Sequence, residues 1–310
     1  MYEAFYGFRV KPFALSPQEE FLFMSRQHRM ALELLVYGLQ NQAMFSVVTG
    51  DIGTGKTTLM RHLFSGRGPS NAVAMITGTL GTFTELLQWI LSEFNVDYQG
   101  LDKRGLQQAL VQQLKWVNAR NKRIILVIDE AQLLAQEALE ELRLFSNINA
   151  GGTMLLQTVL VGQLQLRDTL RRKDMRPLAQ RVGVDYVLAP LDQEQTHAYI
   201  RHRLGFAGGS REDLFTADAC DAIFAAARGI PRIINLFCDT ALVYGYADQK
   251  ATIDAATVKE MFRDKARDGG WLFQRPRPPR RSQVPDVAPA SDAAPAKDRA
   301  GPGSEPGLAA

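Results

Sequence analysis

Cysteine is scarce in this sequence, with 2 among 310 residues, Cys220 and Cys238. Their separation excludes a CxxC redox or zinc motif, and both lie in apolar, helix-like stretches. We therefore expect two reduced thiols in a hydrophobic core rather than a disulfide. The 4 histidines do not cluster with the cysteines, so we expect no structural zinc site.

Long apolar runs are also missing. The longest ones are much shorter than the roughly 20 residues that a membrane-spanning helix requires. The N-terminus lacks the basic stretch followed by an apolar stretch that marks a secretory signal peptide. We therefore expect no transmembrane segment and a cytoplasmic location, with peripheral attachment at the inner membrane left open.

Neither charge sign is in strong excess, because 36 basic residues face 33 acidic ones and the formal net charge is +3. This balance does not favour nucleic-acid binding by overall charge, which leaves only a local basic patch for that role. Residues 275–281 (RPRPPRR) form such a cluster inside a segment rich in proline, alanine and glycine. Because this segment has little apolar surface to bury, we expect residues 269–310 to be a disordered tail.

Before residue 190, apolar strand-like runs alternate with segments of helical spacing, which predicts an α/β fold with a mostly parallel sheet between helices. Beyond it the strand signals stop and four helices are expected. Asp192 and Thr216 are candidate N-caps there. The expected strands are 44–49, 72–77, 123–129, 154–161 and 184–188; the expected helices are 57–65, 83–94, 105–119, 135–148, 192–204, 216–228, 231–247 and 254–267. The predicted units are an α/β domain at 1–190 with an N-terminal helical segment at 1–43, a helical domain at 191–268, and the tail.

Residues 50–57 (GDIGTGKT) match the phosphate-loop pattern G-x-x-x-x-G-K-[ST] and lie between an expected strand and an expected helix. Glycines let backbone N–H groups turn inward around phosphate oxygens, and the following helix adds its positive dipole end. Lys56 is expected to contact the β- and γ-phosphates, and the Thr57 hydroxyl to ligate Mg²⁺. A glycine turn with a purely structural role would need neither the lysine nor the hydroxyl that follows it. The predicted ATP-binding residues here are Gly50, Asp51, Ile52, Gly53, Thr54, Gly55, Lys56, Thr57 and Thr58.

Residues 124–132 (IILVIDEAQ) have the pattern of a buried parallel strand that ends in two carboxylates. In a parallel sheet this end faces the same crevice as the phosphate loop. Asp129 is then expected to hold Mg²⁺, and Glu130 to polarise the water that attacks the γ-phosphate. An acidic pair after a strand often only begins a solvated loop, but its combination with the phosphate loop favours ATP hydrolysis.

Together with these motifs, residues 159–163 (VLVGQ), 178–181 (LAQR) and 229–232 (GIPR) resemble the AAA+ ATPases of the general secretion pathway A (ExeA/GspA) family. The resemblance covers about residues 1–265. Residues 37–42 (YGLQNQ) look similar in particular to ATPases encoded with exopolysaccharide and exosortase (PEP-CTERM) export systems. The family resemblance implies a P-loop NTPase domain of the AAA+ type followed by a helical lid. In the secretion proteins the ATPase part is followed by a transmembrane segment and a peptidoglycan-binding domain, whereas here it is followed by the expected disordered tail. We therefore do not expect this chain to bind the cell wall.

The resemblance also assigns roles to single residues. Gln163 corresponds to the polar residue that senses the γ-phosphate, unless it simply starts the following turn. Arg181 is similar to the arginine finger that acts on a neighbouring subunit's nucleotide, with Arg176 as the competing candidate. Arg232 matches the lid arginine that reaches the nucleotide, since a solvent-facing cation there would oppose the helix dipole.

Two hypotheses for the function follow. The first is an ATPase that forms homo-oligomers, for example a hexamer, and drives assembly or regulation of an envelope secretion or exopolysaccharide export system through membrane-associated partners. The second is a DNA-associated ATPase regulator of the TniB/TnsC transposition type, which has the same core motifs. A weaker variant is a switch that binds ATP and scarcely hydrolyses it without a partner. The aromatic residues Tyr6 and Phe13 either border the adenine or belong to the core.

Overall fold

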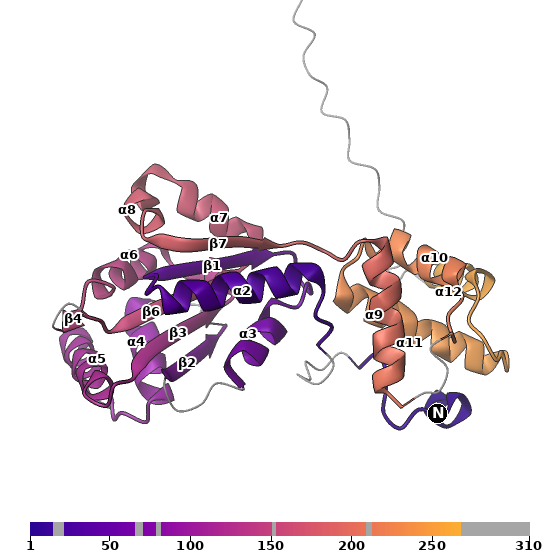
Figure 1. Ribbon diagram of the computed structural model, residues 1–310, viewed down its shortest axis with the longest axis horizontal. Coiled ribbons are helices and arrows are strands. Elements are labelled where there is room, and N and C mark those ends of the chain that lie inside the picture. Colours follow the sequence, from indigo (N-terminus) through magenta and orange to yellow (C-terminus); the bar gives the residue numbers. More distant parts are fainter. Residues whose placement is uncertain (15–21, 66–70, 79–81, 151–152, 209–212, 268–310) are drawn as a thin grey trace, which may run out of the picture. The chain divides into compact units, whose positions relative to one another are not determined.

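The structure is a computed structural model that describes residues 1–14, 22–65, 71–78, 82–150, 153–208 and 213–267. The tail expected at 269–310 lies outside these described residues. Within them, every strand of the main sheet runs parallel to its neighbours (Figure 1). In spatial order the strands are β2 (Asn71–Thr77), β3 (Arg123–Asp129), β6 (Leu156–Gly162), β1 (Phe45–Gly50) and β7 (Val182–Leu188).

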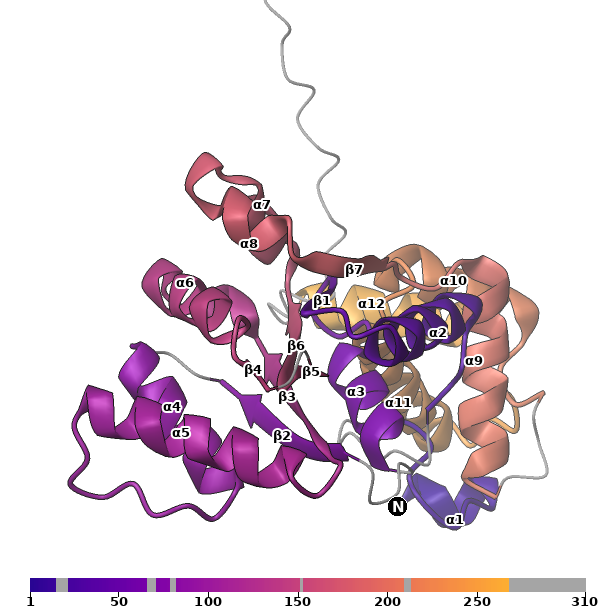
Figure 2. The same cartoon turned by 60° about the vertical axis from the view of Figure 1, so that its left-hand side comes forward.

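Helices cover both faces of this sheet, as the near-continuous apolar strands require. Alternate residues of β3 show the division: Leu126 packs in the core on one face, and Ile125 and Val127 pack in the core on the other. Figure 2 shows the two helix layers. One layer contains α4 (Phe83–Glu93), α5 (Lys103–Asn118) and α6 (Gln136–Phe145); the other contains α2 (Arg26–Gln40) and α3 (Lys56–Ser65).

The segments on either side of β6 contain structure that the sequence pattern did not reveal. Two helices and a 3₁₀ turn follow β6, and a two-stranded antiparallel ribbon precedes it. These elements are α7 (Leu164–Arg171), η3 (Lys173–Met175), α8 (Arg176–Ala179), β4 (Asn149–Ala150) and β5 (Thr153–Met154). They are four residues or fewer except α7, so their periodicity is too short to recognise.

Four helices form the lid, as predicted: α9 (Gln193–Phe206), α10 (Ala217–Ala227), α11 (Pro231–Ala247) and α12 (Ala255–Arg267). Asp192 caps α9 with a capping box, in which its carboxylate accepts the backbone N–H of Gln195. Thr216 is the N-cap of α10 by position, but its hydroxyl donates to Asp218 and to the Ile253 carbonyl instead of accepting a helix N–H.

The first residues of the chain pack against the lid. Helix α1 (Tyr2–Tyr6) contacts α11, and the Tyr6 hydroxyl donates to the Lys250 carbonyl. Phe13 is 1% exposed and meets Phe215 edge to face in the same core. Of the two alternatives for Tyr6 and Phe13, the structure therefore favours core packing. The predicted parallel α/β fold with a helical lid is confirmed, with strand and helix limits mostly within two residues of those expected.

Candidate functional site

The phosphate loop lies between the end of β1 and the first residue of α3, Lys56. Gly53 and Gly55 have φ values of +83° and +97°, a backbone region that side chains rarely adopt. Thr54 is buried, and its hydroxyl donates to the Asp51 carbonyl at 2.9 Å, which closes the loop on itself. The predicted loop residues are therefore arranged as a turn that leads directly into a helix N-terminus.

Lys56 is 6% exposed and reaches across the loop. Its ammonium donates to the carbonyls of Gly50 and Asp51, at 2.9 Å each. Burial lowers the pKa of Lys56, while the carboxylates of Glu130 and Asp129 act in the opposite direction. The lysine is thus a desolvated cation at the centre of the loop, a setting in which its attraction for an anion is strengthened.

Thr57 and Asp129 meet at the carboxyl edge of the sheet, as the sequence predicts. The Thr57 hydroxyl donates to Asp129 Oδ2 at 2.5 Å, and the Asp129 side chain is buried. The second carboxylate oxygen accepts the backbone N–H of Glu130 at 2.9 Å. A hydroxyl and a carboxylate are hard oxygen ligands of the kind that Mg²⁺ prefers, so this pair fits a magnesium site.

Glu130 is held by two amide side chains. Gln132, in the 3₁₀ turn η2 (Ala131–Leu133), donates its Nε2 to Glu130 Oε2 at 2.6 Å, and Gln163 donates its own Nε2 to the same oxygen at 3.3 Å. The Oε1 atom of Gln132 accepts the backbone N–H of Gln163 at 2.9 Å. Glu130 itself has a left-handed backbone, with φ 56° and ψ 36°. A single glutamine side chain therefore connects the acidic strand end of β3 to the end of β6.

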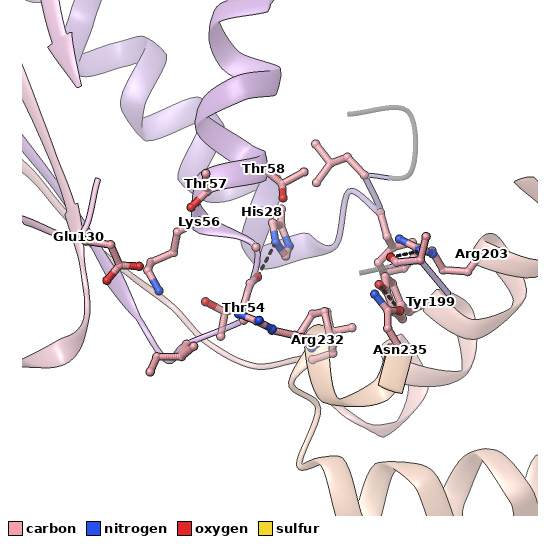
Figure 3. Close-up of a pocket in the computed structure, with 18 residues that line it drawn as sticks. His28, Thr54, Lys56, Thr57, Thr58, Glu130, Tyr199, Arg203, Arg232 and Asn235 are labelled. Carbon is pink, nitrogen blue, oxygen red and sulfur yellow. Dashed lines mark hydrogen bonds between the residues drawn. The ribbon is translucent and has the colours of Figure 1, made fainter. Parts of the chain in front are cut away.

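The lid contributes Arg232, the second residue of α11, to the same place (Figure 3). Its backbone N–H donates to the Gly53 carbonyl at 3.3 Å, and a Cβ at position 53 would lie only 2.6 Å from Arg232 Cβ. The turn before α11 is fixed by Gly229, whose φ is +73° and whose missing side chain leaves room for the Leu191 carbonyl. Glycines on both sides thus allow the lid to approach the phosphate loop.

Arg181 lies away from these residues. Its guanidinium donates to the Arg143 carbonyl and to the Ser146 hydroxyl, both at 2.8 Å, at the C-terminal end of α6. Such a position satisfies free helix carbonyls and suits a cation. Arg176 is exposed at the start of α8, and its guanidinium contacts no partner among the residues that the structure describes. The structure therefore does not bring either arginine to the phosphate loop of its own chain.

A cavity of about 370 Å³ joins the loop to the lid, a size suited to a small-molecule ligand. Several of its lining residues were given no role in the site by the sequence analysis. Arg203 is buried and binds the carbonyls of Pro12 and Ala14, and the Tyr199 hydroxyl donates to Asn235 at 2.8 Å. The missed lining residues include Phe23, His28, Tyr199, Arg203 and Asn235.

Comparison with protein families matches an AAA domain over residues 39–170. Among curated proteins, general secretion pathway protein A of Aeromonas hydrophila is 39% identical over 248 residues, which is 80% of this chain. The chain spans 45% of the length of that relative. No helix among the described residues has the length and apolar character needed to cross a membrane.

Solved structures show the same fold. The match to Cdc6p from Pyrobaculum aerophilum has a TM-score of 0.64 and 20% identity, and it covers 79% of this chain and 70% of that one. The match to the ORC2 protein of Aeropyrum pernix, determined as ADPNP–ADP complexes, has a TM-score of 0.59 and 16% identity, and it covers 77% and 67%. The solved structures support the fold alone. The AAA domain match, with the phosphate loop and the acidic strand end in their expected places, and the 39% identity over 80% of the chain show a P-loop ATPase of the AAA type that is related to general secretion pathway protein A.

Proposed function

We propose that this ATPase binds Mg-ATP between the phosphate loop and the lid and couples its hydrolysis to ADP and phosphate to assembly or regulation of an envelope secretion or exopolysaccharide export system. The observation that carries the pathway is the 39% identity to general secretion pathway protein A over 80% of the chain. The two amides on Glu130, together with the Thr57–Asp129 pair, support the hydrolytic part.

In this proposal the loop N–H groups and the Lys56 ammonium hold the phosphates, and the Arg232 guanidinium approaches them from the lid. Arg232 suits this role because it is exposed into the cavity, and its side chain contacts no partner within the described part of the chain. A cation in the first turn of a helix opposes the helix dipole, and a bound anion offsets that cost. Thr57 and Asp129 would hold Mg²⁺, which neutralises charge on the phosphate oxygens.

For hydrolysis, Glu130 acts as the general base. Two amide N–H groups occupy Oε2, whereas Oε1 accepts no hydrogen bond from the described residues. Oε1 is therefore the atom that takes a proton from the attacking water while the bond between the γ-phosphorus and its bridging oxygen breaks. Gln132 is a positioning residue, since it fixes the direction of this carboxylate. Its own amide is fixed in turn by the Gln163 N–H.

The oligomer is also part of the proposal. An arginine that is absent from its own chain's phosphate loop is available to a neighbouring copy, where a guanidinium stabilises charge on the transferred phosphoryl group. Arg181 would have to leave its contacts with Arg143 and Ser146 to do so. Arg176 is already exposed. Its exposure favours Arg176 as the arginine finger over Arg181, which the sequence resemblance favoured.

The first prediction separates binding from hydrolysis. Lys56→Ala should weaken Mg-ATP affinity about 10- to 100-fold, because a charge-assisted contact of about 1.5–3 kcal/mol is lost. Glu130→Gln should bind ATP like the wild type but lower kcat about 10²- to 10⁴-fold, because an amide accepts no proton from water. Calorimetric titration and phosphate release measure the two effects. Wild-type turnover by Glu130→Gln would show that another group is the base.

The second prediction concerns Gln132. Gln132→Ala should lower kcat about tenfold while ATP affinity stays within about twofold, because the amide orients Glu130 and donates nothing to the phosphate loop. Gln108→Ala on the exposed face of α5 is the matched control and should leave both values unchanged. An equal loss of affinity and turnover would contradict a positioning role for Gln132.

The third prediction concerns the shared site. Wild-type turnover per subunit should rise with protein concentration, and Arg176→Ala or Arg181→Ala should lower the plateau at least about 100-fold. Mixing the defective arginine variant with Glu130→Gln should restore part of the activity, because one mixed interface contains both a sound base and a sound arginine. A constant specific rate with both arginine variants unaffected would exclude the shared site.

The fourth prediction tests the pathway. ATP turnover should rise when the protein is added to vesicles that contain the membrane proteins of an envelope secretion or exopolysaccharide export system from the same cell, and not with vesicles lacking them. Duplex DNA at low salt serves as the second arm, because phosphate contacts to DNA weaken steeply with salt. Stimulation by DNA alone would instead favour the transposition-type regulator.

A further inference from the structure

His28 lies directly against the phosphate loop, although the sequence analysis assigned it no role. It belongs to the first turn of α2 and is 4% exposed. Its Nε2 is 3.1 Å from the Thr54 carbonyl oxygen (Figure 3). Its Nδ1 is 2.7 Å from the Ser25 hydroxyl. Ser25 is the N-cap of α2 and also accepts the backbone N–H of His28 at 3.3 Å.

The partners fix the protons on this ring. A carbonyl oxygen only accepts, so Nε2 must carry the hydrogen that points to Thr54. Burial lowers the pKa of His28, which keeps the imidazole neutral near pH 7. Nδ1 is then the acceptor nitrogen, 2.7 Å from the Ser25 hydroxyl, which also lies 3.1 Å from Gln27 Oε1. The contact with the loop therefore needs the neutral tautomer that carries its hydrogen on Nε2.

The contact controls one peptide plane of the loop. In a trans peptide the Thr54 C=O and the Gly55 N–H point in opposite directions. Because His28 draws the carbonyl toward α2, the Gly55 N–H is turned to the other side. Gly55 also has to lack a side chain, since a Cβ there would lie 2.9 Å from His28 Nε2.

We propose that His28 is a positioning residue of the phosphate loop, which holds the Thr54 carbonyl outward so that the Gly55 N–H faces the polyphosphate of the nucleotide. The inference rests on the proposed ATP site and adds to it a residue from the N-terminal helix. An unsupported Thr54–Gly55 peptide could rotate and present its carbonyl oxygen to the phosphates, which would repel them.

A competing role follows from the same position. His28 lines the cavity together with Phe23, so its imidazole could instead contact the nucleoside. The two roles differ in which part of the ligand they affect. Loop positioning acts on any polyphosphate, including one without a base, whereas a nucleoside contact acts only on ligands that carry the base.

The experiment compares ADP with pyrophosphate, each with Mg²⁺, by competition against a fluorescent ADP analogue on the full chain. His28→Leu removes the donor at similar side-chain volume and should weaken both ligands by the same factor, about 5- to 10-fold. His28→Gln places an amide N–H near the position of Nε2 and should restore most of the affinity. His62→Leu, at an exposed histidine of α3, is the matched control and should change neither.

The outcomes are distinct. Loss of ADP binding with unchanged pyrophosphate binding would overturn the proposal and assign His28 to the nucleoside. Unchanged binding of both ligands, or no recovery in His28→Gln when its unfolding midpoint matches the wild type, would also overturn it. A wild-type chain that binds neither ligand would refute the nucleotide site itself, which separates that failure from the failure of His28 alone.

Discussion

The parallel register of the central sheet is the constraint on which the site depends. Strand β6 lies between β3 and β1, so the carboxyl ends of the three strands meet at one edge. Asp129 is the last residue of β3, and the phosphate loop follows β1. Strand β6, which lies between them, ends at Gly162. A Cβ at position 162 would lie 2.6 Å from Gln132 Oε1, so this glycine leaves the room in which the glutamine reaches the Gln163 N–H. The orientation of Glu130 thus follows from strand order and one missing side chain.

The lid depends on glycine in a similar way. The lid contacts the phosphate loop through its backbone, because the Arg232 N–H donates to the Gly53 carbonyl. A side chain at position 53 would collide with Arg232. Gly229 permits the tight turn against Leu191, whose N–H donates to the Gly229 carbonyl at 2.9 Å. A close backbone approach makes the position of the Arg232 guanidinium sensitive to the loop conformation, and so to whatever the loop binds.

Much of this arrangement could be predicted because it is encoded locally. The strands and helices have clear periodicity, and the residues from Gly50 to Thr57 and from Ile124 to Gln132 carry complete motifs. His28, Tyr199 and Arg203 could not be found in the same way, because their roles arise from contacts between segments distant in sequence. The contacts of Arg181 with α6 were hidden for the same reason, since a family pattern locates an arginine along the chain but not its partner.

The N-terminal segment connects the two halves of the cavity. Phe13 is buried in the lid core, whereas Ser25 and His28 support the phosphate loop. Arg203 of α9 binds two carbonyls of this segment, with Nε 2.6 Å from the Pro12 oxygen and Nη2 3.0 Å from that of Ala14. Breaking such charged, buried hydrogen bonds costs about 1.5–3 kcal/mol each. The residues before position 15 are therefore tied to the lid, while the helix that begins at residue 26 is tied to the loop. The N-terminal residues thus support both walls of the cavity, the lid through Pro12 and Ala14 and the phosphate loop through His28.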